Sequence, residues 1–163
     1  MNNTISNSYL LFRLQEELFA VSVHKVLEII ETGDEHHITH LPKAASSIAG
    51  VVNFRGDVIP VVNSRLKFDM DNYSEGEKFV VIILNLQINE QEHVVGLKAD
   101  KVVDVIEIKN EDVKPIPEVG QGYNSDYIEG VVNRANKFIM LLNLENAISS
   151  NEIVKLKEDT VED

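Results

Sequence analysis

Apolar residues in this chain alternate with polar ones or form short unbroken runs rich in valine, isoleucine, leucine and phenylalanine. This pattern is typical of β-strands, which favour β-branched and aromatic side chains. We predict strands at Tyr9–Leu14, Leu18–Ser22, Val26–Glu31, Val51–Phe54, Asp57–Asn63, Lys78–Leu86, Glu92–Leu97, Val102–Ile108, Val131–Arg134 and Lys137–Asn143. Short helical pieces are predicted at Ala44–Ile48 and Ser125–Ile128, and single turns at His24–Val26 and Asp100–Val102.

The strand pattern is repeated within the chain. Residues 48–63 return as residues 128–143 with seven of sixteen positions identical, whereas chance gives about one. The upstream segments align as well, because residues 9–30 resemble residues 79–106. An internal repeat indicates architecture more reliably than local pattern does. We therefore predict a mainly β fold of two small five-stranded barrels packed together, since closure removes exposed sheet edges. The polar connection 69–77 is the expected boundary between the copies.

Composition narrows the class of protein. A chain of 163 residues with 44% hydrophobic content can bury a core of its own. The absence of cysteine excludes a disulfide framework, a thiolate metal site and a cysteine nucleophile. A net charge of −12 argues against binding nucleic acid or anionic lipid, both of which require a basic face. No apolar run approaches the ~20 residues of a membrane helix. We expect a cytoplasmic protein that is a monomer when isolated.

Motifs of catalysis are missing from the sequence. It contains no phosphate-binding loop, no nucleophile elbow and no paired-histidine zinc motif. The candidate metal cluster is His36, His37 and His40, but adjacent histidines in an extended loop point apart and no carboxylate with fixed spacing completes a site. We therefore predict no catalytic residues, no metal and no cofactor. A small hydrolase that uses this histidine loop is the alternative of a different class.

Arg55 is the side chain that the barrel pattern does not require. It forms a two-residue turn with Gly56 between two apolar strands, and the second copy has Ala135 at the matching position. A copy that folds without the arginine indicates that Arg55 serves recognition or a local ion pair, for which Glu28 is the candidate partner. The alternative is an ordinary solvated arginine at a turn.

The same residues carry a family resemblance. The segment 48–65 (IAGVVNFRGDVIPVVNSR) resembles the central signature of CheW-type chemotaxis coupling proteins, and segments 9–30, 94–106 and 127–145 resemble their other strands. The similarity covers residues 8–148 and leaves an acidic tail at 149–163 that could form a last helix. One departure is clear: the family's usual Asp-Leu-Arg is here Asn63-Ser64-Arg65.

The resemblance implies two five-stranded, SH3-like barrels over a shared hydrophobic seam, with short helices and with the N-terminal strand and C-terminal segment able to cross between barrels. It implies no enzymatic activity. It implies a cytoplasmic adaptor, recruited to membrane-associated arrays, that couples methyl-accepting chemoreceptor tips to the regulatory domain of the histidine kinase CheA. A chemotaxis-like pathway with another output, such as pili or a second messenger, is the alternative.

The resemblance also implies two sets of binding residues, which we take as expectations. The receptor-binding set at the seam and its rim is Val26, Ile30, Gly50, Asn53, Arg55, Gly96 and Val105. The kinase-binding set on the first barrel is Glu28, Arg55, Val58, Ile59 and Val61.

Overall fold

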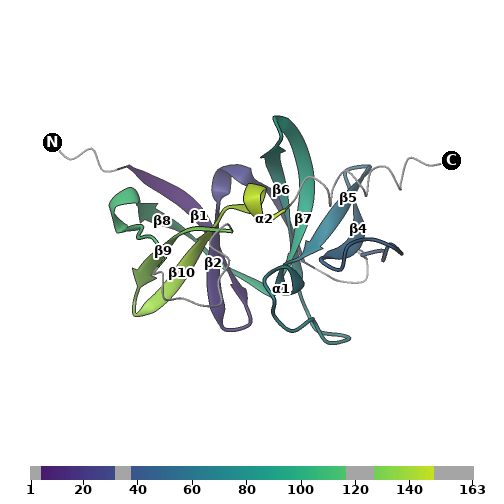
Figure 1. The fold of residues 1–163 in the computed structure, drawn as a ribbon, viewed down its shortest axis with the longest axis horizontal. Coiled ribbons are helices and arrows are strands. Elements are labelled where there is room, and N and C mark those ends of the chain that lie inside the picture. The colour runs from purple at the N-terminus through teal and green to yellow at the C-terminus, as the bar shows by residue number, and fades with distance from the viewer. Residues whose placement is uncertain (1–4, 32–37, 117–126, 149–163) are drawn as a thin grey trace.

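The computed structural model describes residues 5–31, 38–116 and 127–148, which form two five-stranded sheets that lie side by side (Figure 1). Sheet A has the strand order β8-β1-β2-β10-β9, and sheet B has the order β3-β6-β7-β5-β4. The strands of sheet A are β1 (Ser6–Leu14), β2 (Glu17–Ser22), β8 (Lys101–Lys109), β9 (Ile128–Arg134) and β10 (Lys137–Leu142). Those of sheet B are β3 (Val26–Glu31), β4 (Ile48–Phe54), β5 (Asp57–Asn63), β6 (Val80–Ile88) and β7 (Gln91–Ala99). The predicted mainly β fold with two five-stranded units is confirmed.

The two sequence copies exchange strands. The first copy places β1 and β2 in sheet A and β3, β4 and β5 in sheet B, whereas the second copy places β6 and β7 in sheet B and the remaining three strands in sheet A. Each sheet therefore holds a hairpin from one copy between strands of the other copy. The hairpin pairs in parallel on one side, as β2–β10 and β5–β7, and antiparallel on the other, as β1–β8 and β3–β6. This exchange is larger than the crossing of single segments that we predicted. The connection 69–77 joins two strands of sheet B.

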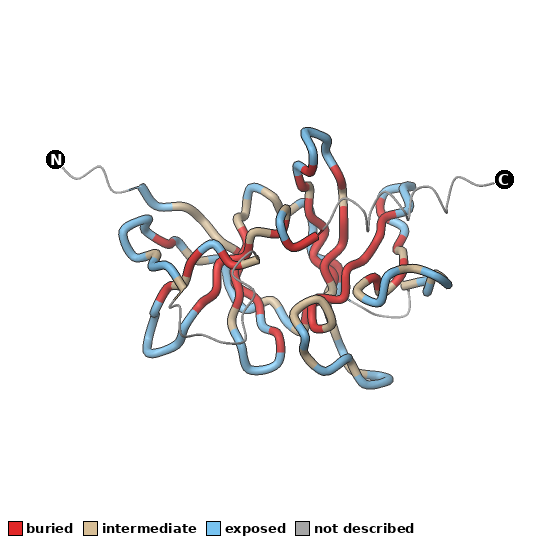
Figure 2. Tube along the Cα trace, viewed as in Figure 1, coloured by how far each residue is buried: buried red, intermediate tan, exposed pale blue. Residues whose placement is uncertain are grey.

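Three hydrophobic cores hold the sheets. One lies within sheet A, one within sheet B, and the largest lies at the seam between them. In β1 the side chains of Leu10 and Phe12 point into the seam core while Leu11 points into the core of sheet A, since successive side chains of a strand face opposite ways. Strands buried on both faces explain the unbroken apolar runs. Figure 2 shows the buried segments along these strands and the exposed hairpin tips around them.

The helices are short. They are α1 (Ser64–Lys67) and α2 (Leu144–Ala147), with 3-10 turns η1 (Val23–Lys25) and η2 (Asn110–Asp112). None of the helices in the described ranges is long and apolar enough to cross a membrane. Asn63 and Asn143 occupy the same position in the repeat, and each accepts a hydrogen bond at the start of a helix, from Leu66 N and Asn146 N, both at 3.2 Å. Helix capping is therefore the reason that asparagine recurs there.

Some of the predicted local structure is wrong. The segment 44–48 is not a helix: residues 46–47 form a turn in which Ile48 N donates to Ala45 O at 2.9 Å, and β4 begins at Ile48. The carbonyl of Ser47 accepts a hydrogen bond from Asn63 N at the end of β5, at 2.7 Å. The second predicted helical piece lies partly outside the described residues, and its last residues form a turn and the start of β9. The predicted turn near His24 is confirmed by η1. At Asp100 the chain makes only a bend between β7 and β8.

Candidate functional site

The turn between β4 and β5 holds Arg55 in the left-handed region, with φ of 52° for Arg55 and 86° for Gly56. Asn53 Oδ1 accepts a hydrogen bond from Gly56 N at 3.2 Å, which fixes the turn. Arg55 Nη2 donates to Glu28 Oε1 at 3.3 Å and the guanidinium lies 4.7 Å from the centre of the Phe54 ring. The predicted ion pair is thus present, and it joins β3, one edge of sheet B, to the turn at the other edge.

The exposure of this pair limits its contribution to folding. The side chains of Arg55 and Glu28 are 66% and 46% exposed, and exposed ion pairs contribute at most about 1 kcal/mol. The alternative for Arg55 was an ordinary solvated arginine, which needs no partner. Arg55 is instead held in place by the ion pair with Glu28 and by the ring of Phe54. The geometry therefore favours a role in presenting a surface over a role in stability.

Exposed apolar side chains occur on the elements that this pair connects. Leu27 and Ile29 on β3 are 42% and 38% exposed, and Val58 on β5 is 64% exposed. Sheet A repeats the arrangement at the matching positions of the second copy: Val103 and Val105 on β8 are 42% and 56% exposed, and Phe138 on β10 is 63% exposed. We call these two sets the exposed apolar residues of sheets B and A.

Arg134 has a counterpart role in sheet A. Its Nη2 donates to the backbone oxygen of Glu107 on β8 at 2.8 Å, so it joins the turn between β9 and β10 to the edge strand of its sheet. The second copy thus supplies a guanidinium one position earlier than Arg55. Sequence reasoning identified Val58 and Val105 but missed the other four residues, which are Leu27, Ile29, Val103 and Phe138. The signal available was the repeat itself, which places apolar residues at both members of each matched pair.

The residues expected to bind a receptor do not converge on one groove. Ile30 belongs to the core of sheet B, and a side chain at Gly96 would meet Val81 and Val61 of that core. Gly50 is buried as well. Val26 is partly buried against the seam core, whereas Val105 is exposed on β8 of sheet A.

The residues expected to bind the kinase are partly exposed and partly buried. Glu28, Arg55 and Val58 are exposed, but Ile59 and Val61 are 3% and 0% exposed because alternate residues of β5 face the core of sheet B. Their side chains are therefore not available as direct contacts.

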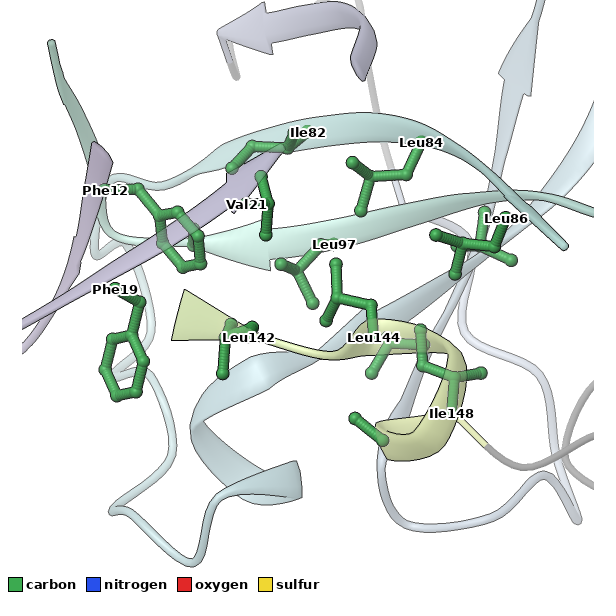
Figure 3. Close-up of a cluster of buried hydrophobic side chains, with 14 of the residues drawn as sticks. Phe12, Phe19, Val21, Ile82, Leu84, Leu86, Leu97, Leu142, Leu144 and Ile148 are labelled. Carbon is green, nitrogen blue, oxygen red and sulfur yellow. The ribbon is translucent and has the colours of Figure 1, made fainter. Parts of the chain in front are cut away.

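The seam is filled. Figure 3 shows the packed side chains that meet there, which include Leu144 of α2 and Ile148 directly after it. Leu144, Ala147 and Ile148 are each at most 2% exposed. Burying a large apolar side chain contributes about 1.5–3 kcal/mol, so displacing α2 would cost several kcal/mol. The hydrophobic seam between the two sheets is therefore occupied by the protein's own side chains.

A buried charge cluster lies around Arg65, whose side chain is 7% exposed. Its Nε donates to Asp100 Oδ1 at 2.9 Å and its Nη2 to Asp100 Oδ2 at 2.7 Å, and Nη2 also donates to Glu77 Oε2 at 2.7 Å. The guanidinium carbon stacks 3.9 Å from the centre of the Tyr73 ring. Sequence reasoning missed this cluster, because its members come from α1, from the connection before β6 and from the end of β7.

The cluster shifts its members' ionisation. The hydrogen bond to Asp100 raises the pKa of Arg65 even though burial opposes it, and burial raises the pKa of Tyr73. Burial would raise the pKa of Asp100, but the hydrogen bonds from Arg65 and from the backbone of Gln15 lower it on balance. Burial, followed by the charge of Arg65, lowers the pKa of Lys98. Arg65 and Asp100 therefore stay charged and paired at neutral pH.

The departure from the family's Asp-Leu-Arg has a structural outcome. Asn63 still caps α1, as an aspartate would. Ser64 is fully buried and its hydroxyl donates to the carbonyl of Lys98. The arginine of the motif is Arg65, the centre of the charge cluster. The substitutions thus keep the cap and the cation, and they add one hydrogen bond to β7.

No group of three or more His, Asp or Glu side chains is placed to hold a metal ion among the residues described. His40 is exposed, while His36 and His37 lie outside the described residues. A cavity of about 520 Å³ next to α1 is lined mostly by polar side chains, including Asn63, Asn72 and Lys98.

Comparison with known proteins places the chain. The family described as CheW-like domain matches residues 8–152. The chemotaxis protein CheW of Klebsiella aerogenes is 30% identical over 150 residues, which cover 92% of this chain and 86% of that protein. Protein FrzA of Myxococcus xanthus is 30% identical over 142 residues, which cover 85% and 83%.

A solved structure agrees with these sequence comparisons. The crystal structure of the scaffolding protein TtCheW from Thermoanaerobacter tengcongensis superimposes with a TM-score of 0.75 at 26% identity and covers 91% of each chain. A match over nearly the whole described fold, together with the paired sheets and the motif 48–65, is decisive: this chain belongs to the CheW-like family.

Proposed function

We propose that this chain is a non-catalytic cytoplasmic adaptor that couples methyl-accepting chemoreceptors to the histidine kinase CheA and is recruited to membrane-associated receptor arrays. The observation that carries the proposal is the family match over residues 8–152. The exposed apolar residues of both sheets support it, because an adaptor needs two separate surfaces. The similar protein TtCheW is a scaffolding protein, which supports the same role for this chain.

For the kinase, the proposal uses sheet B. Leu27, Ile29 and Val58 are exposed on the elements joined by the Arg55–Glu28 pair. By the family resemblance, the regulatory domain of CheA has the same fold, so related apolar strands can meet in a pseudo-symmetric contact. The buried residues Ile59 and Val61 act indirectly, because they hold β5 against the core of sheet B.

For the receptor, the exposed members of the predicted set remain the candidate direct contacts. These are Asn53 and Arg55 on sheet B and Val105 on sheet A. Ile30, Gly50 and Gly96 are buried and would act by shaping the backbone beneath. A helical hairpin tip docks on apolar side chains with a polar rim, and Val105 next to charged β8 residues has that character.

Calorimetric titration of the chain with the regulatory domain of its cognate kinase, and separately with a receptor tip, tests the proposal. Val58→Glu should weaken kinase-domain binding at least about tenfold, since burial of a valine side chain contributes ~1.5 kcal/mol. The matched control is Phe138→Glu, at the equivalent exposed position of sheet A, which should leave kinase-domain affinity unchanged. Binding of neither partner by the parent chain would overturn the proposal.

The similarity to FrzA keeps a second output open, a chemotaxis-like pathway that controls something other than swimming. A swimming-plate assay of a deletion strain separates the two, because only the first predicts a swimming defect. The hydrolase alternative is tested by metal analysis of protein purified without a histidine tag. Stoichiometric metal would revive it.

A further inference from the structure

The chain passes from one sheet to the other at two places within the described residues. The first is η1, between β2 of sheet A and β3 of sheet B, and the second is Asp100, between β7 of sheet B and β8 of sheet A. A charged side chain from a short helix pairs with each crossing. Arg65 of α1 pairs with Asp100, and Glu145 of α2 pairs with Lys25 of η1.

The Arg65–Asp100 pair ties both sheets to one carboxylate. Arg65 lies in α1, directly after β5 of sheet B, and its guanidinium donates two hydrogen bonds to Asp100, of 2.9 and 2.7 Å. Asp100 Oδ2 also accepts the backbone N–H of Gln15 at 2.7 Å, and Gln15 forms the turn between β1 and β2 of sheet A. A rotation of one sheet against the other would break these bonds, which are directional and charge-assisted.

The Lys25–Glu145 pair is the counterpart at the other crossing, with the charges reversed, and Lys25 lies one position after His24, the residue that matches Asp100 in the repeat. Arg65 and Glu145 are each the second helical residue after a capping asparagine, so they match in the repeat. Lys25 Nζ lies 2.6 Å from Glu145 Oε1, and the two side chains are 33% and 23% exposed. Because the charges are reversed, Arg65 cannot pair with Lys25, nor Glu145 with Asp100.

We propose that these two ion pairs are orientation locks, which hold sheets A and B at one relative angle and match each helix to its own crossing. The seam core supplies the apolar attraction between the sheets, which is non-directional, whereas the bonds of the two ion pairs are directional. Because the two copies are similar, the strands of one copy could also pair with the wrong hairpin. That arrangement would place Arg65 near Lys25 and Glu145 near Asp100, and the repulsion between like charges would disfavour it. The proposal concerns the relative position of the sheets and does not depend on the partners of the protein.

Distance measurement between spin labels tests the locks. The chain has no native cysteine, so Gln87→Cys on β6 and Asn133→Cys on β9, both exposed, place one label on each sheet. In this background we compare Lys25→Met, Arg65→Lys and Arg65→Met. The matched control is Arg55→Ala, which removes an ion pair that lies within sheet B.

The parent and Arg55→Ala should give one narrow distance distribution. Lys25→Met and Arg65→Lys should broaden it or shift its mean, and Arg65→Met more so, as long as circular dichroism shows folded protein. The charge swap Lys25→Glu with Glu145→Lys should restore the parent distribution. If Arg65→Met fails to fold, the distance distributions of Lys25→Met and Arg65→Lys are compared with that of the parent. Parent-like distributions in both of these folded variants would overturn the proposal.

Discussion

Gly50 is the position where the structure forbids a side chain most strictly. Its φ is +149°, and a Cβ there would lie 2.2 Å from the carbonyl oxygen of Thr39 and 2.9 Å from Cγ2 of Ile38. Thr39 is held in place because it exchanges two backbone hydrogen bonds with Val51, of 2.8 and 2.9 Å. Gly50 is therefore a point of close backbone approach, and the segment that approaches it is Ile38–Thr39.

The cost of Gly50→Ala follows from these contacts. A side chain at this φ is strained by about 1–3 kcal/mol. Moving Thr39 away breaks two hydrogen bonds at about 0.5–1.5 kcal/mol each. We therefore expect a loss of about 2–6 kcal/mol in the free energy of unfolding, against about 5–15 kcal/mol for a typical domain. Gly50→Asp should lose more, since it also buries a charge without a partner.

Urea unfolding followed by circular dichroism measures this loss. The control is Gly56→Ala, which has a comparable backbone constraint, φ of +86°, but nothing within 4 Å of the added carbon. It should cost only about 1–2 kcal/mol. At Gly130, the repeat equivalent, an added Cβ meets a side chain of Val113 at 2.4 Å and the carbonyl oxygen of Lys114 at 3.3 Å, so Gly130→Ala should be intermediate. Equal midpoints for Gly50→Ala and Gly56→Ala would refute the reasoning.

Four other substitutions have effects that can be predicted from the contacts of the residue replaced. Arg55→Ala should leave the fold intact, since Ala135 adopts the same φ of 53° in the second copy, yet it should impair kinase activation in a reconstituted receptor–adaptor–kinase assay. Arg134→Ala should cost about 0.5–1.5 kcal/mol of stability through its lost hydrogen bond but leave kinase activation intact; equal activation losses would show that general positive charge is what matters. The pKa of Asp100 is lowered below its ordinary 3.8, so its contribution to stability is present above that value and is lost as the pH falls below it. Unfolding of Asp100→Asn should therefore depend less steeply on pH in this acid range, and an unchanged slope would contradict that assignment. Val26→Glu should lower the melting temperature, because Val26 packs against the seam core; a folded variant of normal stability would count against that placement.

Much of the fold could be predicted from the sequence because its information is local or periodic. The alternation of apolar residues predicts the strands, and the repeat predicts two five-stranded units with matched turns. Arg55 was recognised because the repeat offers Ala135 as a reference at the same position. Glu28 was named as its candidate partner from its charge and its place on the strand 26–31, and the structure contains that ion pair.

The tertiary structure alone decided how the copies share strands. Similar hairpins fit either sheet, so the sequence does not state that β1 and β2 join strands from the other copy. The same limit applies to burial: Ile30, Ile59 and Val58 look alike as apolar strand residues, and only the direction of each side chain separates core from surface. Asp100 and Arg65 are 35 residues apart, and no local pattern connects them. Their pairing depends on where the chain crosses between sheets, which only the packed seam determines.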